Sequence, residues 1–396
     1  MRIAYVCADP GVPVFGQKGC SIHVQEVIRA IRRQGAWVEL FAARFDGEPP
    51  ADLAEVPVYR LPEPPKGNLA AREQLCLGAN AALFAALEVA GPFDSIYERY
   101  SLWSHAGMAY ARASGIPGLL EVNAPLIQEQ AQHRGLIDYH GATQVAQRAF
   151  GAATALLAVS QEVATYLEGW PVASGRVHVV PNGVNPERFP AVVQPARPCR
   201  PGTFTVGFVG SLKPWHGLPV LVEAFAMLHQ RNADVRLLIV GDGPEQGSLR
   251  TALSGRGVLA ATELAGAVAP DAAPGFLASM DVAVAPYPPQ PNFYFSPLKV
   301  YEYMAAGLPV VASRIGQLAE LIRDGANGLL CPPGDPVALA EALERLRRAP
   351  ELRTRLGQAG RATVLQNYTW RAVAQRIFQL AGCAPALQTV TGREVA

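Results

Sequence analysis

The sequence predicts an α/β protein made of two doubly wound domains that face each other across a central cleft. Strand-like apolar runs alternate with helical patterns over almost the whole chain, which is typical of α/β units on parallel sheets. A strand, a glycine-containing loop and a helix follow one another at the N-terminus, and the same order returns after residue 203. A chain of 396 residues is also long enough for two domains.

The first domain begins with an apolar strand at residues 3–8, followed by a glycine-containing loop at residues 9–21. The next apolar side chains recur with the spacing of one helix face. They are Val24, Val27, Ile28 and Ile31. Gly35 is expected to end this helix. Further strands are expected at residues 38–42, 95–97, 118–122 and 155–159.

The second domain repeats this pattern. An apolar strand ends in Gly210, a short loop follows, and a helix face then recurs at Leu221, Ala224, Phe225 and Leu228. The next strand, at residues 235–240, leads into a loop that contains Asp242 and Gly243. Ligands of doubly wound sheets bind beyond the carboxyl ends of the strands. Gly210, Asp242 and Gly243 are therefore candidate binding residues.

We expect an N-terminal domain at residues 1–188 and a C-terminal domain at residues 204–368. Residues 189–203 between them are predicted to be a linker, because they are rich in proline and lack periodicity. An amphipathic helix is expected at residues 369–382, and its pattern fits packing on either domain. The tail at residues 383–396 is expected to be flexible.

Composition excludes several classes of protein. The formal net charge of +1 gives no indication of a nucleic-acid partner or an anionic membrane. The six cysteines are scattered without a C-x-x-C pair, so reduced thiols are expected rather than disulfides or a zinc site. The N-terminus has no signal-peptide layout, and no apolar run is long enough to span a bilayer. We therefore expect a soluble, cytoplasmic protein with no transmembrane segment.

The segment that begins at Ser296 is the most informative part of the chain. Ser296 suits the N-cap of a helix, Pro297 suits its first position, and Gly307 suits its end. Lys299 and Glu302 project from the first two turns, beside a helix terminus that attracts anions. A cation, a carboxylate and free amides together suit a diphosphate linked to a ribose. Ser296, Lys299 and Glu302 are therefore candidate binding residues.

Lysine is rare in this chain. Among 34 basic residues the lysines are Lys18, Lys66, Lys213 and Lys299, and all but Lys66 lie in or just after loops expected to face phosphate. Lysine carries a compact charge on a flexible stem, which suits phosphate. The alternative is that these lysines occupy exposed loops and face water.

Several motifs follow one another along the chain. They are Pro181-Asn182-Gly183-Val184-Asn185, residues 240–245, Gly266-x-Val268 and residues 302–313. Together they resemble the GT-B glycosyltransferases of family GT4, the retaining group that uses nucleotide sugars. The resemblance implies two Rossmann-like domains, with the donor nucleotide on the second and the acceptor mainly on the first. It also implies that the last helix returns to the N-terminal domain.

The resemblance assigns Glu302 to the donor ribose, as the second glutamate of the family's E-x7-E motif. The first glutamate of that motif falls at Tyr294, so the chain departs from the family near the transferred sugar. Either Tyr294 or nearby amides recognise the sugar differently, or the site is weakened. Pro297 removes one amide, while those of Leu298 and Lys299 remain for the sugar or the diphosphate.

Family members usually carry Arg and Lys in the loop after the first strand of the second domain, where they contact the diphosphate. The aligned residues here are Ser211 and His216. We expect Lys213 to be the main cation, with His216 assisting, because breaking the anomeric bond leaves negative charge on the β-phosphate. The alternative is that both side chains face water. Val268 resembles the backbone contact to the nucleotide base.

In the first domain, Gly19 matches the second glycine of the family's Gly-Gly loop, where a missing side chain lets the backbone approach a ligand. A turn glycine without a ligand is the alternative. Ser21 lies close by in the sequence and is a further candidate binding residue, although the role of its side chain is open. Asn123 stands where relatives often carry a histidine near the donor sugar and is therefore a candidate catalytic residue, whose amide can bond a sugar hydroxyl but cannot act as a general base. The alternative is that Asn123 closes an Asx turn. Residues 97–105 fit the acceptor side or a buried aromatic cluster.

The expected reaction moves a sugar, with retention, from a nucleotide-diphosphate sugar to the hydroxyl of a small molecule, saccharide or lipid-linked glycan. The transition state should resemble an oxocarbenium ion. No D-x-D motif occurs, so neither a metal nor another cofactor is expected. A GT-B epimerase or hydrolase and a non-catalytic nucleotide-sugar-binding module are the alternatives. A nicotinamide dehydrogenase is excluded because no G-x-G-x-x-G follows the first strand.

Overall fold

The computed structural model describes residues 1–64, 67–291 and 293–383, and two compact units are distinguished in it. The first unit contains Met1–Val159, Val163–Pro181 and the chain from Trp370 onward. The second contains Ser160–Glu162 and Asn182–Thr369, so it begins before the expected domain boundary. Apart from Cys383, the predicted flexible tail lies outside the described residues.

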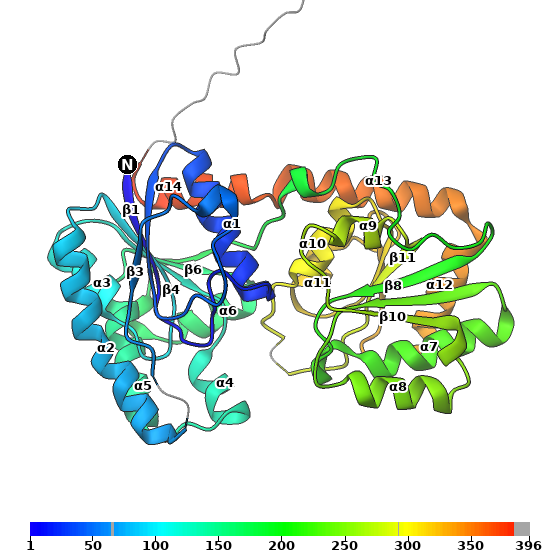
Figure 1. The fold of residues 1–396 in the computed structure, drawn as a ribbon, viewed down its shortest axis with the longest axis horizontal. Helices are drawn as coiled ribbons and strands as arrows, with labels where there is room; N and C mark the ends of the chain where they lie inside the picture. Colours follow the sequence, from blue (N-terminus) through cyan, green and yellow to red (C-terminus); the bar gives the residue numbers. More distant parts are fainter. Residues whose placement is uncertain (65–66, 292, 384–396) are drawn as a thin grey trace, which may run out of the picture. The chain divides into compact units, whose positions relative to one another are not determined.

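The first unit holds a parallel sheet in the order β3-β2-β1-β4-β5-β6-β7 (Figure 1). Its strands are β1 (Arg2–Cys7), β2 (Trp37–Ala42), β3 (Val58–Arg60), β4 (Ser95–Arg99), β5 (Gly118–Val122), β6 (Ala155–Ala158) and β7 (Val177–Val179). The interior strands β5 and β6 are buried throughout, and apart from Glu121 in β5 their residues carry no charge, as expected for strands covered on both faces. The strand order reverses between β1 and β4, and ligands of such sheets bind beside this point.

Helices flank this sheet. They are α1 (Gly19–Arg33), α2 (Leu69–Ala90), α3 (Ala106–Ala113), α4 (Leu126–His133), α5 (Tyr139–Ala152), α6 (Gln161–Glu168) and α14 (Trp370–Leu380). Local signals start two of them, because Asn68 caps α2 and Asp138 caps α5 through their side-chain oxygens. The C-terminal helix α14 packs on α1, and the Trp370 ring meets the His23 ring edge-on at 5.0 Å.

The second unit holds a parallel sheet in the order β10-β9-β8-β11-β12-β13 (Figure 1). Its strands are β8 (Phe204–Val209), β9 (Val235–Val240), β10 (Thr262–Gly266), β11 (Val282–Ala285), β12 (Val310–Ser313) and β13 (Leu329–Cys331). Its helices are α7 (Leu218–Arg231), α8 (Gln246–Gly255), α9 (Ala273–Leu277), α10 (Leu298–Ala305), α11 (Gly316–Leu321), α12 (Pro336–Arg348) and α13 (Pro350–Asn367). The predicted α/β class with parallel sheets is confirmed.

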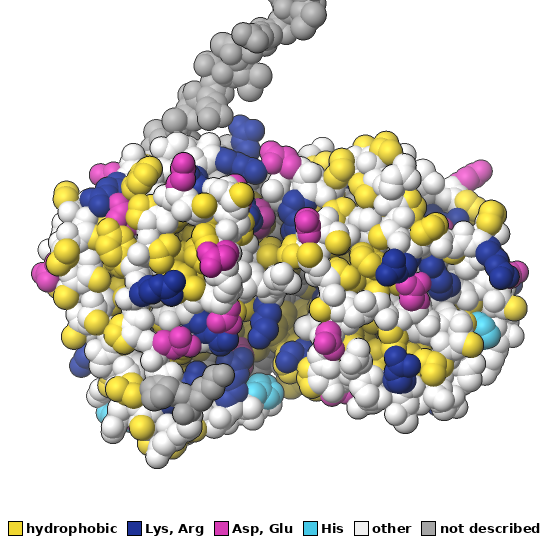
Figure 2. All heavy atoms as spheres, viewed as in Figure 1, with side chains coloured by type: hydrophobic (Ala, Val, Ile, Leu, Met, Phe, Trp, Pro, Cys, Tyr) yellow, Lys and Arg dark blue, Asp and Glu magenta, His cyan; other side chains and the backbone are white. Residues whose placement is uncertain are grey.

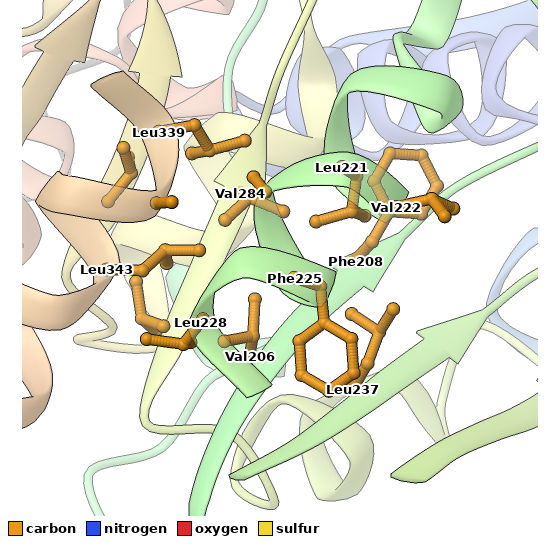
Figure 3. Packing of buried hydrophobic residues seen from close by; sticks show 14 of the residues in the cluster. Val206, Phe208, Leu221, Val222, Phe225, Leu228, Leu237, Val284, Leu339 and Leu343 are labelled. Carbon is orange, nitrogen blue, oxygen red and sulfur yellow. The ribbon is translucent and has the colours of Figure 1, made fainter. Parts of the chain in front are cut away.

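The core of the second unit lies between the sheet and the helices α7 and α12. Figure 3 shows Phe225 and Leu221 of α7 against Val206 and Phe208 of β8, and Leu343 comes from α12. These side chains are almost completely buried. Burial of large apolar side chains on both elements therefore fixes α7 on the strand whose carboxyl end leads into the candidate site.

Charge is distributed without a dominant sign. On the face drawn in Figure 2, side chains of Lys and Arg are interspersed with those of Asp and Glu over both units. Within the described part of the chain, no helix is both long enough and apolar enough to span a bilayer.

Phe225→Ala tests the core of the second unit. We expect the free energy of unfolding of this unit to fall by about 3–5 kcal/mol, because a large buried ring is replaced by a cavity. Hydrogen exchange of peptides from β8 and β9, measured in increasing urea, reports this unit separately. Val337→Ala on α12 is the control, since Val337 is 49% exposed and its truncation should change the free energy of unfolding only slightly. Equal effects of the two substitutions would contradict the packing described.

Candidate active site

The loops that follow β8 and β9 interlock through their backbones. The amide of Leu212 donates to the carbonyl oxygen of Asp242 over 2.9 Å. Gly241 has a φ of +140°, and a Cβ on it would lie 1.9 Å from the carbonyl oxygen of Gly210. A Cβ on Gly243 would lie 2.4 Å from the carbonyl oxygen of Leu212. Contact between the loops therefore requires the glycines at 241 and 243, while binding by Gly210, Asp242 and Gly243 stays a prediction.

One side chain fastens α10 to the end of β8. The Tyr303 hydroxyl donates to the carbonyl oxygen of Val209 over 2.8 Å and accepts from the amide of Val209, also over 2.8 Å. Gly307 ends the helix as predicted, with a φ of +76°, and the amide of Leu308 donates to the Tyr303 carbonyl oxygen. The helix is thus held against the carboxyl end of the central strand.

The start of α10 differs from the prediction. The helix begins at Leu298, with Pro297 in the cap position. Ser296 does not cap it, because its hydroxyl donates to Oε1 of Gln317 over 2.7 Å. The expected cap was therefore wrong. By helix geometry the first amides, those of Leu298 and Lys299, have no acceptor inside the helix and are suited to an anion.

Lys299 places its ammonium group inside the second unit. Among the described residues, Nζ is buried without a hydrogen-bond partner. It lies 4.4 Å from the ring centre of Phe208 and 5.4 Å from that of Tyr287. A Cβ on Gly210 would lie 3.0 Å from Nζ, so glycine leaves space beside the ammonium. Burial lowers the pKa of Lys299 to about 7.

His216 is neutral rather than cationic. Its Nδ1 lies 2.5 Å from the carbonyl oxygen of Ser211, which can only accept, so Nδ1 carries the proton. Burial, and then the nearby charge of Lys299, lower the pKa of His216 to about 3. Its predicted role as an assisting cation does not agree with this geometry, which leaves Nε2 as an acceptor. Lys213 lies with Nζ 5.8 Å from the ring centre of Trp215, and its predicted role stays untested.

Glu302 is held by an arginine that the sequence analysis missed. Its Oε1 lies 3.1 Å from Nη1 of Arg188, whose Nη2 donates to the carbonyl oxygen of Pro270 over 2.8 Å. Arg188 therefore links α10 to the loop after β10, which carries Val268. The predicted ribose and base contacts thus lie on linked elements. Only the position of Arg188 just after the Pro181–Asn185 motif could have indicated it.

Tyr294 lies in the loop before α10. Its ring packs on Phe295 with 4.5 Å between ring centres, and its carbonyl oxygen accepts from the Ser160 hydroxyl over 3.1 Å. The carboxylate expected from the family at this position is therefore replaced by an aromatic side chain in an aromatic cluster. Whether Tyr294 contacts the transferred sugar stays a prediction.

In the first unit, Gly19 is the first residue of α1, and Lys18 occupies the cap position without a side-chain cap. A Cβ on Gly19 would meet no atom within 4 Å, so packing among the described residues does not require glycine there. Ser21 is completely buried, and its hydroxyl has no hydrogen-bond partner among the described residues. A Cβ on Gly16 would lie 3.0 Å from that hydroxyl. The predicted binding roles of Gly19 and Ser21 stay untested.

Glu121, at the end of β5, is the centre of a buried cluster that the sequence analysis did not identify. Nε2 of His23 lies 2.8 Å from its carboxylate, and Nη1 of Arg99 lies 3.0 Å from Oε1. The Tyr97 hydroxyl and Nδ2 of Asn123 also donate to it. Burial opposes ionisation, but these donors, His23 first, hold the pKa of Glu121 well below its usual range.

This cluster orients Asn123. An ionised carboxylate can only accept hydrogen bonds, so the amide nitrogen of Asn123 must face Glu121 and the amide oxygen must face away. Asn123 therefore offers an acceptor, which suits a sugar hydroxyl. Its predicted catalytic role stays untested.

A pocket opens beside the carboxyl ends of β1, β2 and β4 in the first unit. Its walls are mainly apolar and include Ala8, Pro10, Leu61 and Trp103, with Ser101 and Ser104 among the few polar groups. The predicted cluster at residues 97–105 is thus divided, with Tyr97 in the Glu121 cluster and Trp103 in the pocket wall. Among the described residues, no group of three His, Cys, Asp or Glu side chains is arranged to hold a metal ion.

Comparisons with known proteins agree with this architecture. Residues 18–188 match the model described as Glycosyltransferase Family 4, and residues 203–348 match the one described as Glycosyl transferases group 1. The fold and these matches define a glycosyltransferase with the GT-B fold. The chain belongs to family GT4.

The curated relatives act on different substrates. The chain is 30% identical to D-inositol 3-phosphate glycosyltransferase of Actinosynnema mirum, over 95% of this chain and 94% of the relative. It is 26% identical to 2-deoxystreptamine glucosyltransferase of Streptomyces kanamyceticus, over 94% of this chain and 99% of the relative. It is 37% identical to phosphatidyl-myo-inositol mannosyltransferase of Mycobacterium leprae, where the match spans only about half of each chain (51% and 52%).

Solved structures share the fold at low sequence identity. Sucrose-phosphate synthase from Thermosynechococcus elongatus superposes with a TM-score of 0.72 at 22% identity, over 96% of this chain and 98% of that one. Anabaena Alr3699/HepE, solved in complex with UDP and glucose, superposes with a TM-score of 0.71 at 19% identity, over 96% of this chain and 99% of that one.

Glu121→Gln tests the buried cluster. We expect the free energy of unfolding at pH 7 to fall by about 3–5 kcal/mol, because Arg99 is left without a buried counter-charge. The folded-state pKa of Glu121 is lowered, so its contribution is present above the unfolded pKa of about 4.3 and lost as the pH falls below it. The difference between wild type and variant should therefore narrow toward pH 3.

Urea unfolding between pH 3 and pH 7 measures this difference. Asp46→Asn is the matched control, because Asp46 pairs with Arg44 at a surface position where its side chain is 48% exposed. That substitution should change the free energy by no more than about 1 kcal/mol. A pH-independent difference between Glu121→Gln and wild type would contradict the assignment.

Proposed function

We propose that this glycosyltransferase uses a nucleotide-diphosphate sugar as donor, transfers the sugar to an acceptor hydroxyl with retention and needs no metal ion. The observation that carries this proposal is the convergence of three kinds of group around α10. Glu302 supplies a carboxylate, Leu298 and Lys299 supply helix amides, and Lys299 supplies a buried ammonium. A ribose and a diphosphate require these groups within one site.

The donor roles follow from these positions. Glu302, fixed by Arg188, would accept from the ribose hydroxyls, and Val268 on the linked loop would contact the base through its backbone. The amides of Leu298 and Lys299 would bind phosphate or sugar oxygens. Ser296 would contribute indirectly, because the hydrogen bond from its hydroxyl to Gln317 holds the loop that precedes α10.

The acceptor is expected to use the first unit. The pocket at the carboxyl ends of its strands is mainly apolar, which suits the carbon face of a ring. The names of three relatives contain inositol or 2-deoxystreptamine. Inositol is a cyclic polyol, and 2-deoxystreptamine is a cyclic aminopolyol. We therefore propose a cyclic, hydroxyl-bearing acceptor that places one face against this pocket.

The proposed reaction balances without an added base. The bond between the anomeric carbon and the β-phosphate oxygen breaks, and its electron pair stays on that oxygen. The acceptor oxygen bonds to the anomeric carbon from the same face, and its proton passes to the released phosphate oxygen. Retention follows because attack and departure share one face. Cationic side chains and amides would stabilise the departing charge, so a metal is not needed for this purpose.

A cytoplasmic location is part of the same proposal. All six cysteines are free in the structure, which suits a reducing compartment.

The proposal is tested with a panel of intact UDP-, GDP-, ADP- and dTDP-sugars, with magnesium and with a chelator. Thermal stabilisation by one donor, unchanged by the chelator, would support a metal-independent nucleotide-sugar site. Proton NMR of the product made from that donor and cyclic polyol acceptors then reports the anomeric configuration. Inversion would exclude the proposed mechanism, while free or epimerised sugar would indicate a hydrolase or an epimerase, and binding without turnover a binding module.

Glu302→Ala tests the ribose contact. We expect donor affinity to fall about 10- to 100-fold, because a charged acceptor of hydroxyl hydrogen bonds is lost. Isothermal titration with the donor found in the panel measures this. Glu341→Ala on α12 is the control, since Glu341 is exposed and lies outside the site. Unchanged affinity in Glu302→Ala would exclude the assignment.

A further inference from the structure

The buried ammonium group of Lys299 lacks a hydrogen-bond acceptor and a counter-charge among the described residues. Its Nζ is removed from solvent, yet no hydrogen-bond acceptor lies within reach among the described residues. Contacts with the rings of Phe208 and Tyr287 stabilise a cation only in part. Buried charges in proteins are normally paired and hydrogen-bonded, so the environment of Lys299 is incomplete without an anion.

The neighbouring side chains that the structure describes do not supply that anion. Glu302 lies on the same helix, but its carboxylate pairs with Arg188. The loop after β8 brings His216, which is neutral, and Lys213, which is a second cation. Tyr287 after β11 presents its ring, and Tyr303 on α10 uses its hydroxyl on Val209.

The position of Lys299 indicates a phosphate ligand. Lys299 lies in the first turn of α10, where its own amide and that of Leu298 have no acceptor inside the helix. Its Nζ is close to Gly210, at the carboxyl end of β8, where a side chain would fill the space. An ammonium, two helix amides and a bare glycine backbone on one edge of a parallel sheet suit oxygens of a diphosphate.

We propose that Lys299, rather than Lys213, is the cation that pairs with the diphosphate of the donor. The inference rests on the proposed function and assigns the role that Arg and Lys in the loop after β8 have in other family members. Lys213 is partly exposed, so water already solvates its charge, and less is gained when it meets an anion. Lys299 has lost its water, and a diphosphate would restore a counter-charge to it.

Proton uptake should accompany donor binding. Burial lowers the pKa of Lys299 to about 7 in the free protein, so at pH 8 most molecules hold a neutral amine. A bound diphosphate raises that pKa, and a proton is taken up. At pH 6 the amine is already protonated, and uptake should be small. The diphosphate of an intact nucleotide sugar is fully ionised at both pH values and contributes no proton change.

The test uses the full chain and the intact nucleotide sugar that stabilises wild type in the panel. Titration calorimetry at pH 6 and pH 8, in two buffers of different ionisation enthalpy, measures affinity and proton uptake together. Lys299→Met should lower affinity about 10- to 100-fold and abolish uptake at pH 8. Lys299→Arg should retain more affinity than Lys299→Met and also show no uptake, because arginine stays protonated.

The stability of the ligand-free protein separates binding from a structural role. Lys299→Met removes an unpaired buried charge, so its melting temperature without ligand should equal or exceed that of wild type, while the stabilisation by donor is lost. Arg256→Met is the control for charge removal, because Arg256 is 55% exposed and pairs with Glu223 on the surface of the same unit. It should bind donor as wild type does.

The outcomes are distinct. Wild-type affinity in Lys299→Met would overturn the inference while leaving the proposed function intact. Proton uptake at pH 8 that persists in Lys299→Arg would assign the proton to His216, and this result would also overturn the inference. Failure of wild type to bind any nucleotide sugar would overturn the proposed function itself, and with it the inference.

Discussion

The candidate donor site depends on the attachment of α10 to the central strand β8. Tyr303 makes this attachment with one hydroxyl, which both donates to and accepts from the backbone of Val209. The contact holds the helix whose first turn carries Leu298 and Lys299 and whose second carries Glu302. Because β8 lies in the middle of a parallel sheet, its carboxyl end is flanked by the loops after β9 and β11, and the candidate binding groups of all these elements lie at one edge of the sheet.

The charged side chains in this site differ in their exposure to solvent, and this difference is the basis for the roles proposed for them. Arg188 and Glu302 pair with each other at a partly exposed position, which orients the carboxylate at modest energetic cost. Within the described part of the chain Lys299 has no such partner, and its charge lowers the pKa of His216 further than burial alone. The sequence predicts two cations in the loop after β8, Lys213 and His216, but the structure contains one cation and one neutral acceptor. The cation that most needs a counter-charge is the ammonium of Lys299 on α10.

The first unit shows a different solution to buried charge. The side chain of Glu121 is buried, as is the ammonium of Lys299, but four side chains donate hydrogen bonds to Glu121, and its ionised form is strongly favoured. Such a satisfied cluster stabilises and orients its members, and here it turns the amide oxygen of Asn123 outward. The contrast supports the proposed role of Lys299 in ligand binding, because its ammonium has no hydrogen-bond partner among the described residues, whereas the Glu121 carboxylate has four and holds Asn123 in place.

The sequence alone determined the α/β class, the repeated strand, loop and helix units, and the family, because apolar periodicity and short glycine motifs are local signals. Strands β5 and β9 occupy the predicted residues, and Gly307 ends α10 as expected. Tertiary structure decided the rest. The hydroxyl of Ser296 meets Gln317 instead of the helix start, and Arg188 reaches Glu302 from far along the chain. Such partners depend on which elements the sheet order brings together, and burial, which sets the charge of His216 and Lys299, exists only in the folded chain.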